Sequence, residues 1–102
     1  MQLYYIITKC DTEQIRFQHT EFEKFSQTIA SGYDTYAELK QALDKKFNDL
    51  NHSGGRYVPV EVQRTENGSI NSMVFNEPEF MEDALGNKER STIEIFIAKA
   101  VV

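Results

Sequence analysis

The pattern of apolar and polar positions predicts a strand at each end of the chain. In residues 2–9 and 92–102, large apolar side chains fall on both faces of an extended backbone. A strand that is apolar on both faces is typical of the middle of a sheet, where both faces are covered. We therefore expect these two segments to be neighbours in one sheet.

The longest helical pattern covers residues 35–50. Apolar residues recur there at steps of three and four, which places them on one stripe of an α-helix: Tyr36, Leu39, Leu43, Phe47 and Leu50. Thr35 and Glu38 have the spacing of a capping box, in which a hydroxyl and a carboxylate bind free N–H groups of the first turn. Gly54 or Gly55 can adopt the left-handed conformation that closes a helix. We expect this helix to organise the core.

Two further elements are predicted between residues 10 and 34. Residues 14–18 alternate between apolar and polar side chains, which predicts a strand that forms a hairpin with residues 2–9. In residues 21–30 the apolar positions Phe22, Phe25 and Ile29 fall at helical steps. A short helix is therefore the expectation for this segment.

The second half of the chain predicts a hairpin followed by a short helix. Residues 56–64 alternate, and Pro59 favours an edge position or a bulge because it has no backbone donor. The Asn67-Gly68 pair is typical of a tight turn, and residues 69–75 form the returning strand. Asn76 is then expected to cap a short helix that ends before Gly86.

These elements predict one compact α+β domain spanning residues 1–102. The expected architecture is a mainly antiparallel sheet of about five strands with amphipathic helices on one face, in the order ββααββ(α)β. The alternative is a ferredoxin-like βαββαβ arrangement with an added hairpin strand.

The composition narrows the classes of partner. The net charge of −5 argues against a nucleic-acid partner, which would require a basic face, and favours a protein partner with a basic surface. The apolar runs are too short to cross a membrane, so no membrane partner is expected. No export signal is visible at the start of the chain, and we expect a cytoplasmic location.

Recognised catalytic and metal-binding motifs are not found in the sequence. The single cysteine, Cys10, excludes an intramolecular disulfide and a cysteine-based metal cage. His19 and His52 lie far apart in the sequence, and their spacing matches no recognised metal site. We therefore expect no catalytic residue, metal or cofactor. The alternative is a small-molecule or metal-dependent enzyme or binder that uses Cys10, His19 and His52.

The clearest asymmetry of charge lies between residues 65 and 87, which include acidic residues and neither lysine nor arginine. Within it, residues 77–83 interleave acids with two large apolar side chains. We predict a partner-binding patch made of Glu77, Glu79, Phe80, Met81, Glu82 and Asp83. The simpler interpretation is a solvent-exposed helix face whose apolar residues enter the core.

The leading hypothesis from these features is a small acidic, non-catalytic binding protein that modulates or inhibits a protein partner. Immunity proteins and virus-encoded inhibitors of host defence share this size and charge, which is an analogy of class only. Besides the enzyme or binder, a structural homodimerisation domain is the second alternative, because an uncovered sheet face or an edge strand can pair two copies.

Overall fold

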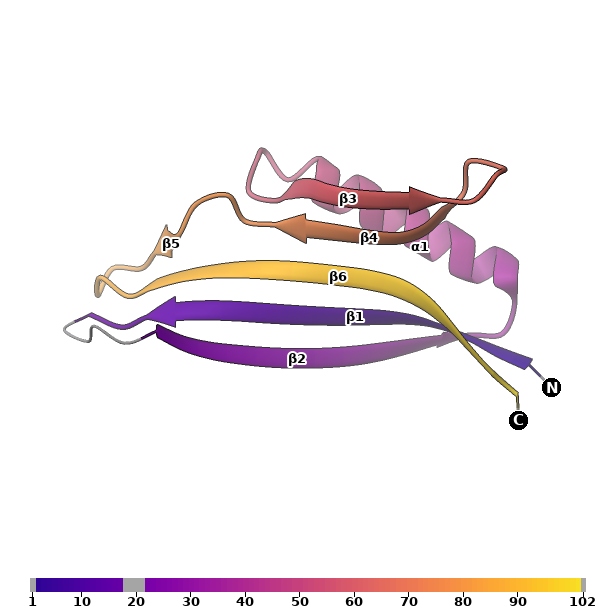
Figure 1. Ribbon diagram of the computed structural model, residues 1–102, viewed down its shortest axis with the longest axis horizontal. Helices are drawn as coiled ribbons and strands as arrows, with labels where there is room; N and C mark the ends of the chain where they lie inside the picture. Colours follow the sequence, from indigo (N-terminus) through magenta and orange to yellow (C-terminus); the bar gives the residue numbers. More distant parts are fainter. Residues whose placement is uncertain (1, 18–21, 102) are drawn as a thin grey trace.

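The chain forms an antiparallel sheet with a helix packed on one face (Figure 1). The computed structural model describes residues 2–17 and 22–101. Within them the elements in chain order are β1 (Gln2–Ile15), β2 (Phe22–Tyr33), α1 (Tyr36–Asn51), β3 (Val58–Arg64), β4 (Ile70–Asn76), β5 (Met81–Glu82) and β6 (Lys88–Val101).

The strand order across the sheet is β2-β1-β6-β4-β3, and the short strand β5 pairs with the beginning of β6. β1 and β6, from the two ends of the chain, are antiparallel neighbours from Gln2↔Val101 to Ile15↔Lys88. The prediction that the two-faced terminal segments are neighbours is thus confirmed. Their length makes the molecule elongated, with extents of 52 × 29 × 20 Å.

Helix α1 begins and ends within one residue of the predicted bounds. The Thr35 hydroxyl accepts a hydrogen bond from the Glu38 backbone N–H at 3.2 Å, which confirms that half of the capping box. Gly54 and Gly55, just beyond the C-cap, have φ of 71° and 86°, the left-handed region that glycine tolerates best.

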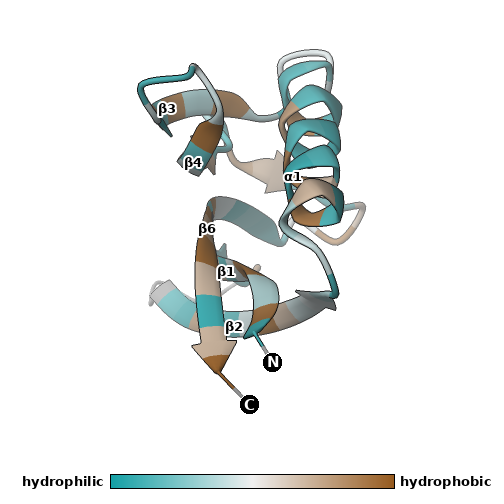
Figure 2. Cartoon of the chain, turned by 90° about the vertical axis from the view of Figure 1, so that its right-hand side faces the viewer, coloured by the Kyte–Doolittle hydropathy of each residue, from teal (hydrophilic) through white to brown (hydrophobic). Residues whose placement is uncertain are grey.

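The core lies between this helix and the middle of the sheet. Leu39 and Leu43 are the fully buried residues of the helix, and the sheet side of the core consists of Ile6, Ile70, Met73, Phe75 and Ile95. Phe47 packs edge-on against Phe75, with ring centroids 5.8 Å apart. The helix covers one face only, and most of its ribbon is coloured hydrophilic (Figure 2).

The predicted short helix over residues 21–30 is wrong, and so is the predicted hairpin strand over residues 14–18. Gln14 and Ile15 continue β1, and residues 22–30 belong to β2, which pairs with β1 along its whole length; residues 18 and 21 lie outside the described parts of the chain. Phe25 and Ile29 are four residues apart, a spacing that fits both helical and alternating patterns. The segment forms a strand because it pairs with β1.

The predicted short helix after Asn76 is also wrong. Asn76 is still paired with Thr92 in the sheet, so it is not available as a helix cap. An irregular segment, the short strand β5 and a turn that ends at Gly86 replace the helix.

The α+β class and the mainly antiparallel sheet are confirmed, whereas the expectation of several helices is not, because the described residues hold a single helix. The ferredoxin-like alternative fails for the same reason, since it requires two. The edge position predicted from Pro59 is correct: β3 is an edge strand and its register shifts between Pro59 and Glu61. At that shift Val60 is exposed, although strict alternation with Val58 and Val62 predicts that it is buried.

Candidate protein-binding site

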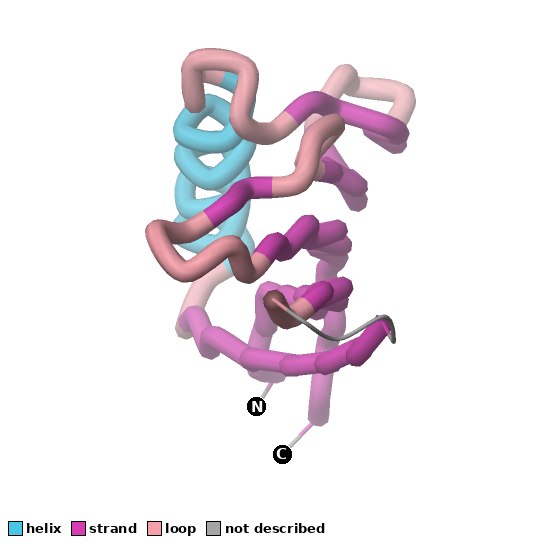
Figure 3. Tube along the Cα trace, turned by 90° about the vertical axis from the view of Figure 1, so that its left-hand side faces the viewer, coloured by secondary structure: helices cyan, strands magenta, loops and turns pink. Residues whose placement is uncertain are grey.

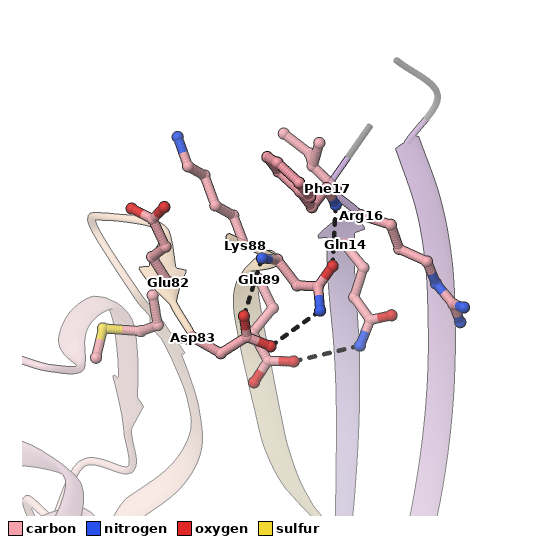
Figure 4. Close-up of a pocket in the computed structure, with 10 residues that line it drawn as sticks. Gln14, Arg16, Phe17, Glu82, Asp83, Lys88 and Glu89 are labelled. Carbon is pink, nitrogen blue, oxygen red and sulfur yellow. Dashed lines mark hydrogen bonds between the residues drawn. The ribbon is translucent and has the colours of Figure 1, made fainter. Parts of the chain in front are cut away.

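An open hollow of about 530 Å³ lies at the end of the sheet that carries β5. Helix α1 does not extend over this end in Figure 1, and Figure 3 views the molecule from it. We call it the turn-end hollow. Its walls come from the end of β1, from β5 and from the beginning of β6, and they consist of Gln14, Ile15, Arg16, Phe17, Met81, Glu82, Asp83, Asn87, Lys88 and Glu89 (Figure 4).

Asp83 organises the turn that forms one wall of the hollow. Its Oδ1 accepts hydrogen bonds from the backbone N–H groups of Leu85 (2.8 Å) and Asn87 (2.9 Å), and its Oδ2 accepts one from the Asn87 side chain (3.0 Å). The Asn87 side chain in turn accepts a hydrogen bond from the backbone N–H of Phe17 at 2.9 Å. These bonds connect the end of β1 to the turn, as Figure 4 shows.

Gly86 is required at the end of this turn for two reasons. Its φ of 86° lies in the left-handed region. A Cβ atom at this position would also lie only 2.9 Å from Cδ2 of the Phe17 ring. The ring therefore rests directly on the backbone of the turn.

Large apolar side chains are exposed around the hollow. Phe17 and Met81, which line the hollow, are 62% and 46% exposed, and Leu85 in the adjoining turn is 73% exposed. Acidic side chains of Glu82 and Glu89 lie among them. Apolar groups surrounded by charge are the composition expected of a protein-binding surface.

Positive charge at the hollow is partly compensated. Arg16 forms an ion pair with Glu23 of β2 at 3.3 Å, and Lys88 lies opposite Glu82 in the β5–β6 pairing. The Arg16–Glu23 ion pair is exposed, and exposed ion pairs contribute little to stability.

The predicted patch is only partly brought together by the fold. Met81, Glu82 and Asp83 line the turn-end hollow, while Glu79 is exposed outside its lining. Phe80 is half-buried, and the guanidinium of Arg90 lies 4.6 Å from the centre of its ring.

Glu77 lies in the interior and is not available to a partner. Its side chain is 2% exposed, and its Oε1 accepts a hydrogen bond from the Ser91 backbone N–H at 3.0 Å. Its Oε2 lies 3.6 Å from Nε of Arg56. Burial raises the pKa of the neighbouring Tyr57 phenol, and the charge of Glu77 raises that pKa further. Glu77 thus joins the loop after α1 to β6.

The sequence did not reveal that the end of β1, above all Phe17, contributes to the hollow, or that Leu85 is exposed in the turn beside it. One signal was present: aspartate at the first position and glycine at the fourth, as in Asp83 and Gly86, are typical of a β-turn. A turn there would have exposed the residues between them. The position of Phe17 depends on pairing between distant segments and had no local signal.

The residues of the alternative enzyme hypothesis lie elsewhere. Cys10 is a half-buried residue of β1, with Sγ 3.7 Å from the Thr12 hydroxyl. His52 caps the end of α1, and its Nδ1 lies 2.8 Å from the Asn48 carbonyl oxygen. His19 is outside the described residues. Within residues 2–17 and 22–101, no group of three or more His, Cys, Asp or Glu side chains is placed to hold a metal.

Comparisons with protein-family models, curated proteins and solved structures found no match for this chain. Across the described residues, no helix combines the length and apolarity needed to cross a membrane.

Acid is expected to loosen the turn at Asp83. The hydrogen bond from the Asn87 side chain, and those from backbone N–H groups, hold the pKa of Asp83 below its usual value. A carboxylate whose pKa is lowered by folding stabilises the fold above its unfolded pKa, and this contribution is lost as the pH falls through the folded pKa. The amide signals of Leu85 and Asn87, followed by NMR, should shift together in this acidic range.

The variant Asp83→Asn is the control for that titration, because it keeps an acceptor oxygen but carries no titrating charge. The coupled shift of the two amide signals should disappear in this variant. A midpoint at or above the usual aspartate value in the unmodified protein would contradict the role assigned to Asp83.

Proposed function

We propose that this chain is a small acidic, non-catalytic binding protein that modulates or inhibits a protein partner with a basic surface, and that the turn-end hollow is its contact site. The observation that carries the proposal is that exposed apolar side chains from two distant segments, Phe17 and Met81, line the same hollow, with the exposed Leu85 in the adjoining turn. Contiguous exposed apolar surface surrounded by polar groups is typical of protein interaction sites.

The order of the turn supports this role. Asp83 and Asn87 hold the turn and the end of β1 by side-chain hydrogen bonds, so Phe17 is presented on a fixed backbone. A surface that is ordered before binding loses less conformational entropy when the partner arrives. The hollow can therefore bind without refolding.

Charge supports the choice of a basic partner. Glu79 and Glu82 are exposed at this end, and the chain as a whole carries a net charge of −5. Acidic groups at the rim of a contact accelerate association with a basic surface and make it sensitive to salt. Immunity proteins and virus-encoded inhibitors of host defence are examples of binding proteins that share this small size and acidic charge. We propose that the protein acts in the cytoplasm.

The variant Phe17→Ala is expected to weaken partner binding by about tenfold or more, as truncation of an aromatic side chain buried in an interface does. Affinity purification with the unmodified protein as bait, from cells that make it, identifies the partner. Calorimetry with the purified partner then measures both affinities.

The matched control is Val60→Ala, because Val60 is 59% exposed, close to the exposure of Phe17, and lies on β3 away from the hollow. Its affinity should equal that of the unmodified protein. The double change Glu79→Lys and Glu82→Lys should slow association and reduce its salt dependence. If the Phe17 and lysine variants bind as tightly as the control, the hollow is not the contact site.

A further inference from the structure

Strand β2 forms an unpaired edge of the sheet. It is the first strand in the sheet order, and within the described residues it pairs only with β1. Every residue from Glu23 to Ala30 is exposed. Proteins usually protect long edges with proline, charges along the strand or a covering element. β2 contains no proline, and its charged residues, Glu23 and Lys24, both lie near its first end.

The middle of this edge has a pattern that reads the same in both directions. The sequence is Phe25-Ser26-Gln27-Thr28-Ile29, with an apolar residue at each end, a hydroxyl residue next to each and Gln27 at the centre. Phe25 and Ile29 are about half exposed, and their register partners Thr12 and Thr8 place them on the face that carries α1. An antiparallel partner with the same sequence would match each apolar residue with the other.

We propose that β2 pairs antiparallel with β2 of a second copy of this chain, about a two-fold axis that passes through Gln27. Phe25 then lies opposite the second copy's Ile29, and Ser26 opposite its Thr28, an arrangement in which cross-strand pairs stabilise the contact. Lys24 lies opposite Ala30 and Glu23 opposite Ser31, so no like charges oppose each other. Moving the register by two residues would place Ile29 opposite Gln27 or Glu23 instead.

The remainder of the fold permits this pairing. A two-fold axis perpendicular to the sheet keeps both helices on the same face. Helix α1 begins beside the end of β2 and extends across that face toward β3 (Figure 1), while the residues of β2 from Glu23 to Ala30 stay exposed. Because the joined strands run in opposite directions, the two turn-end hollows lie at opposite ends of the continuous sheet. Both stay open, so this inference is independent of the proposed function.

A disulfide across the axis tests the register directly. Cys10 is the register partner of Gln27 on β1, so it is first replaced by Cys10→Ser to prevent a bond within one chain. In that background, mild oxidation of Gln27→Cys should produce a covalent dimer, because residues directly opposite have Cβ atoms about 4.5–5.5 Å apart. Lys24→Cys is the control: its two copies would be offset by six residues, roughly 20 Å.

Introducing charges at the apolar positions tests the same contact in solution. Ile29→Lys and Phe25→Glu should each raise the dissociation constant of the dimer by about tenfold or more, since each change occurs twice across the axis. The double variant Phe25→Glu/Ile29→Lys places opposite charges across the axis and should restore a salt-sensitive dimer. Sedimentation measures the mass, and circular dichroism confirms that each variant is folded.

Two results would overturn the proposal. One is a monomer at every concentration tested, with no disulfide at position 27. The other is a dimer that forms equally well in the two single charge variants, or that is linked equally through positions 24 and 27, since either would place the contact elsewhere.

Discussion

Replacing Leu43 with alanine is expected to lower the free energy of unfolding by about 2–5 kcal/mol. Leu43 is 1% exposed and lies in the core formed by α1 and the middle strands. The substitution removes apolar contacts and leaves a cavity that the packed strands and the helix can fill only in part. Urea unfolding followed by circular dichroism measures the loss.

Leu85→Ala is the matched control, because it deletes the same atoms from a side chain that is 73% exposed. Its effect on stability should stay within about 0.5 kcal/mol, as for other surface sites. A loss below about 1 kcal/mol for Leu43→Ala would mean that the helix does not pack on the sheet as described.

Replacing Glu77 with alanine is expected to cost about 1–3 kcal/mol, the usual cost of leaving a buried polar group without its partner. The substitution removes the acceptor for the Ser91 N–H, which is buried in β6, and the ion partner of Arg56. Arg56 is half-exposed and can turn toward water, so the larger cost typical of a fully buried ion pair does not apply. Thermal and urea unfolding both measure the effect.

Glu77→Gln separates the hydrogen bond from the charge. Glutamine keeps an oxygen that can accept from the Ser91 N–H, so this variant should lose less stability than Glu77→Ala. Equal losses would show that the charge on Glu77, rather than its hydrogen bond, stabilises the join between the loop after α1 and β6. No loss in either variant would contradict the interior position of this carboxylate.

The helix could be predicted because its signals are local. The apolar stripe, the Thr35 cap and the glycines after the end all lie within about twenty residues, and each acts through neighbouring residues of the same segment. The turn at Asn67-Gly68 was predictable for the same reason: it closes by a hydrogen bond between Thr65 and Ser69 at 2.8 Å, with Gly68 at a φ of 82°.

The structure of residues 22–33, strand β2, could not be predicted from local sequence signals. Phe25 and Ile29 fit a helix or a strand equally well, because four residues are about one helical turn and also two strand periods. The strand forms because β1 offers a partner along the whole of β2. β1 precedes β2 in the sequence, but the sequence pattern predicted that it ends at residue 9, whereas it extends to Ile15.

The acidic segment shows the same limit at the candidate site. Glu77, Glu82 and Asp83 look alike in the sequence, yet one is buried against β6, one is exposed and one holds a turn. Their different surroundings depend on which strand end lies beside each residue. The charge pattern alone could not distinguish an acidic residue exposed to a partner from one that stabilises the fold.

The sequence by itself determined the helix, the Asn-Gly turn, the pairing of the two terminal strands and the α+β class. Of the helix stripe, Leu39 and Leu43 are buried as predicted, Phe47 and Leu50 are partly buried, and Tyr36 is exposed. These features could be predicted because periodicity, capping and turn chemistry act between near neighbours or mark a segment as central. Only the tertiary structure decided that residues 22–33 are an edge strand, that Glu77 is interior, and that Phe17 and Met81 line one hollow. Those outcomes depend on hydrogen bonds and contacts between segments distant in the chain, which no local pattern encodes.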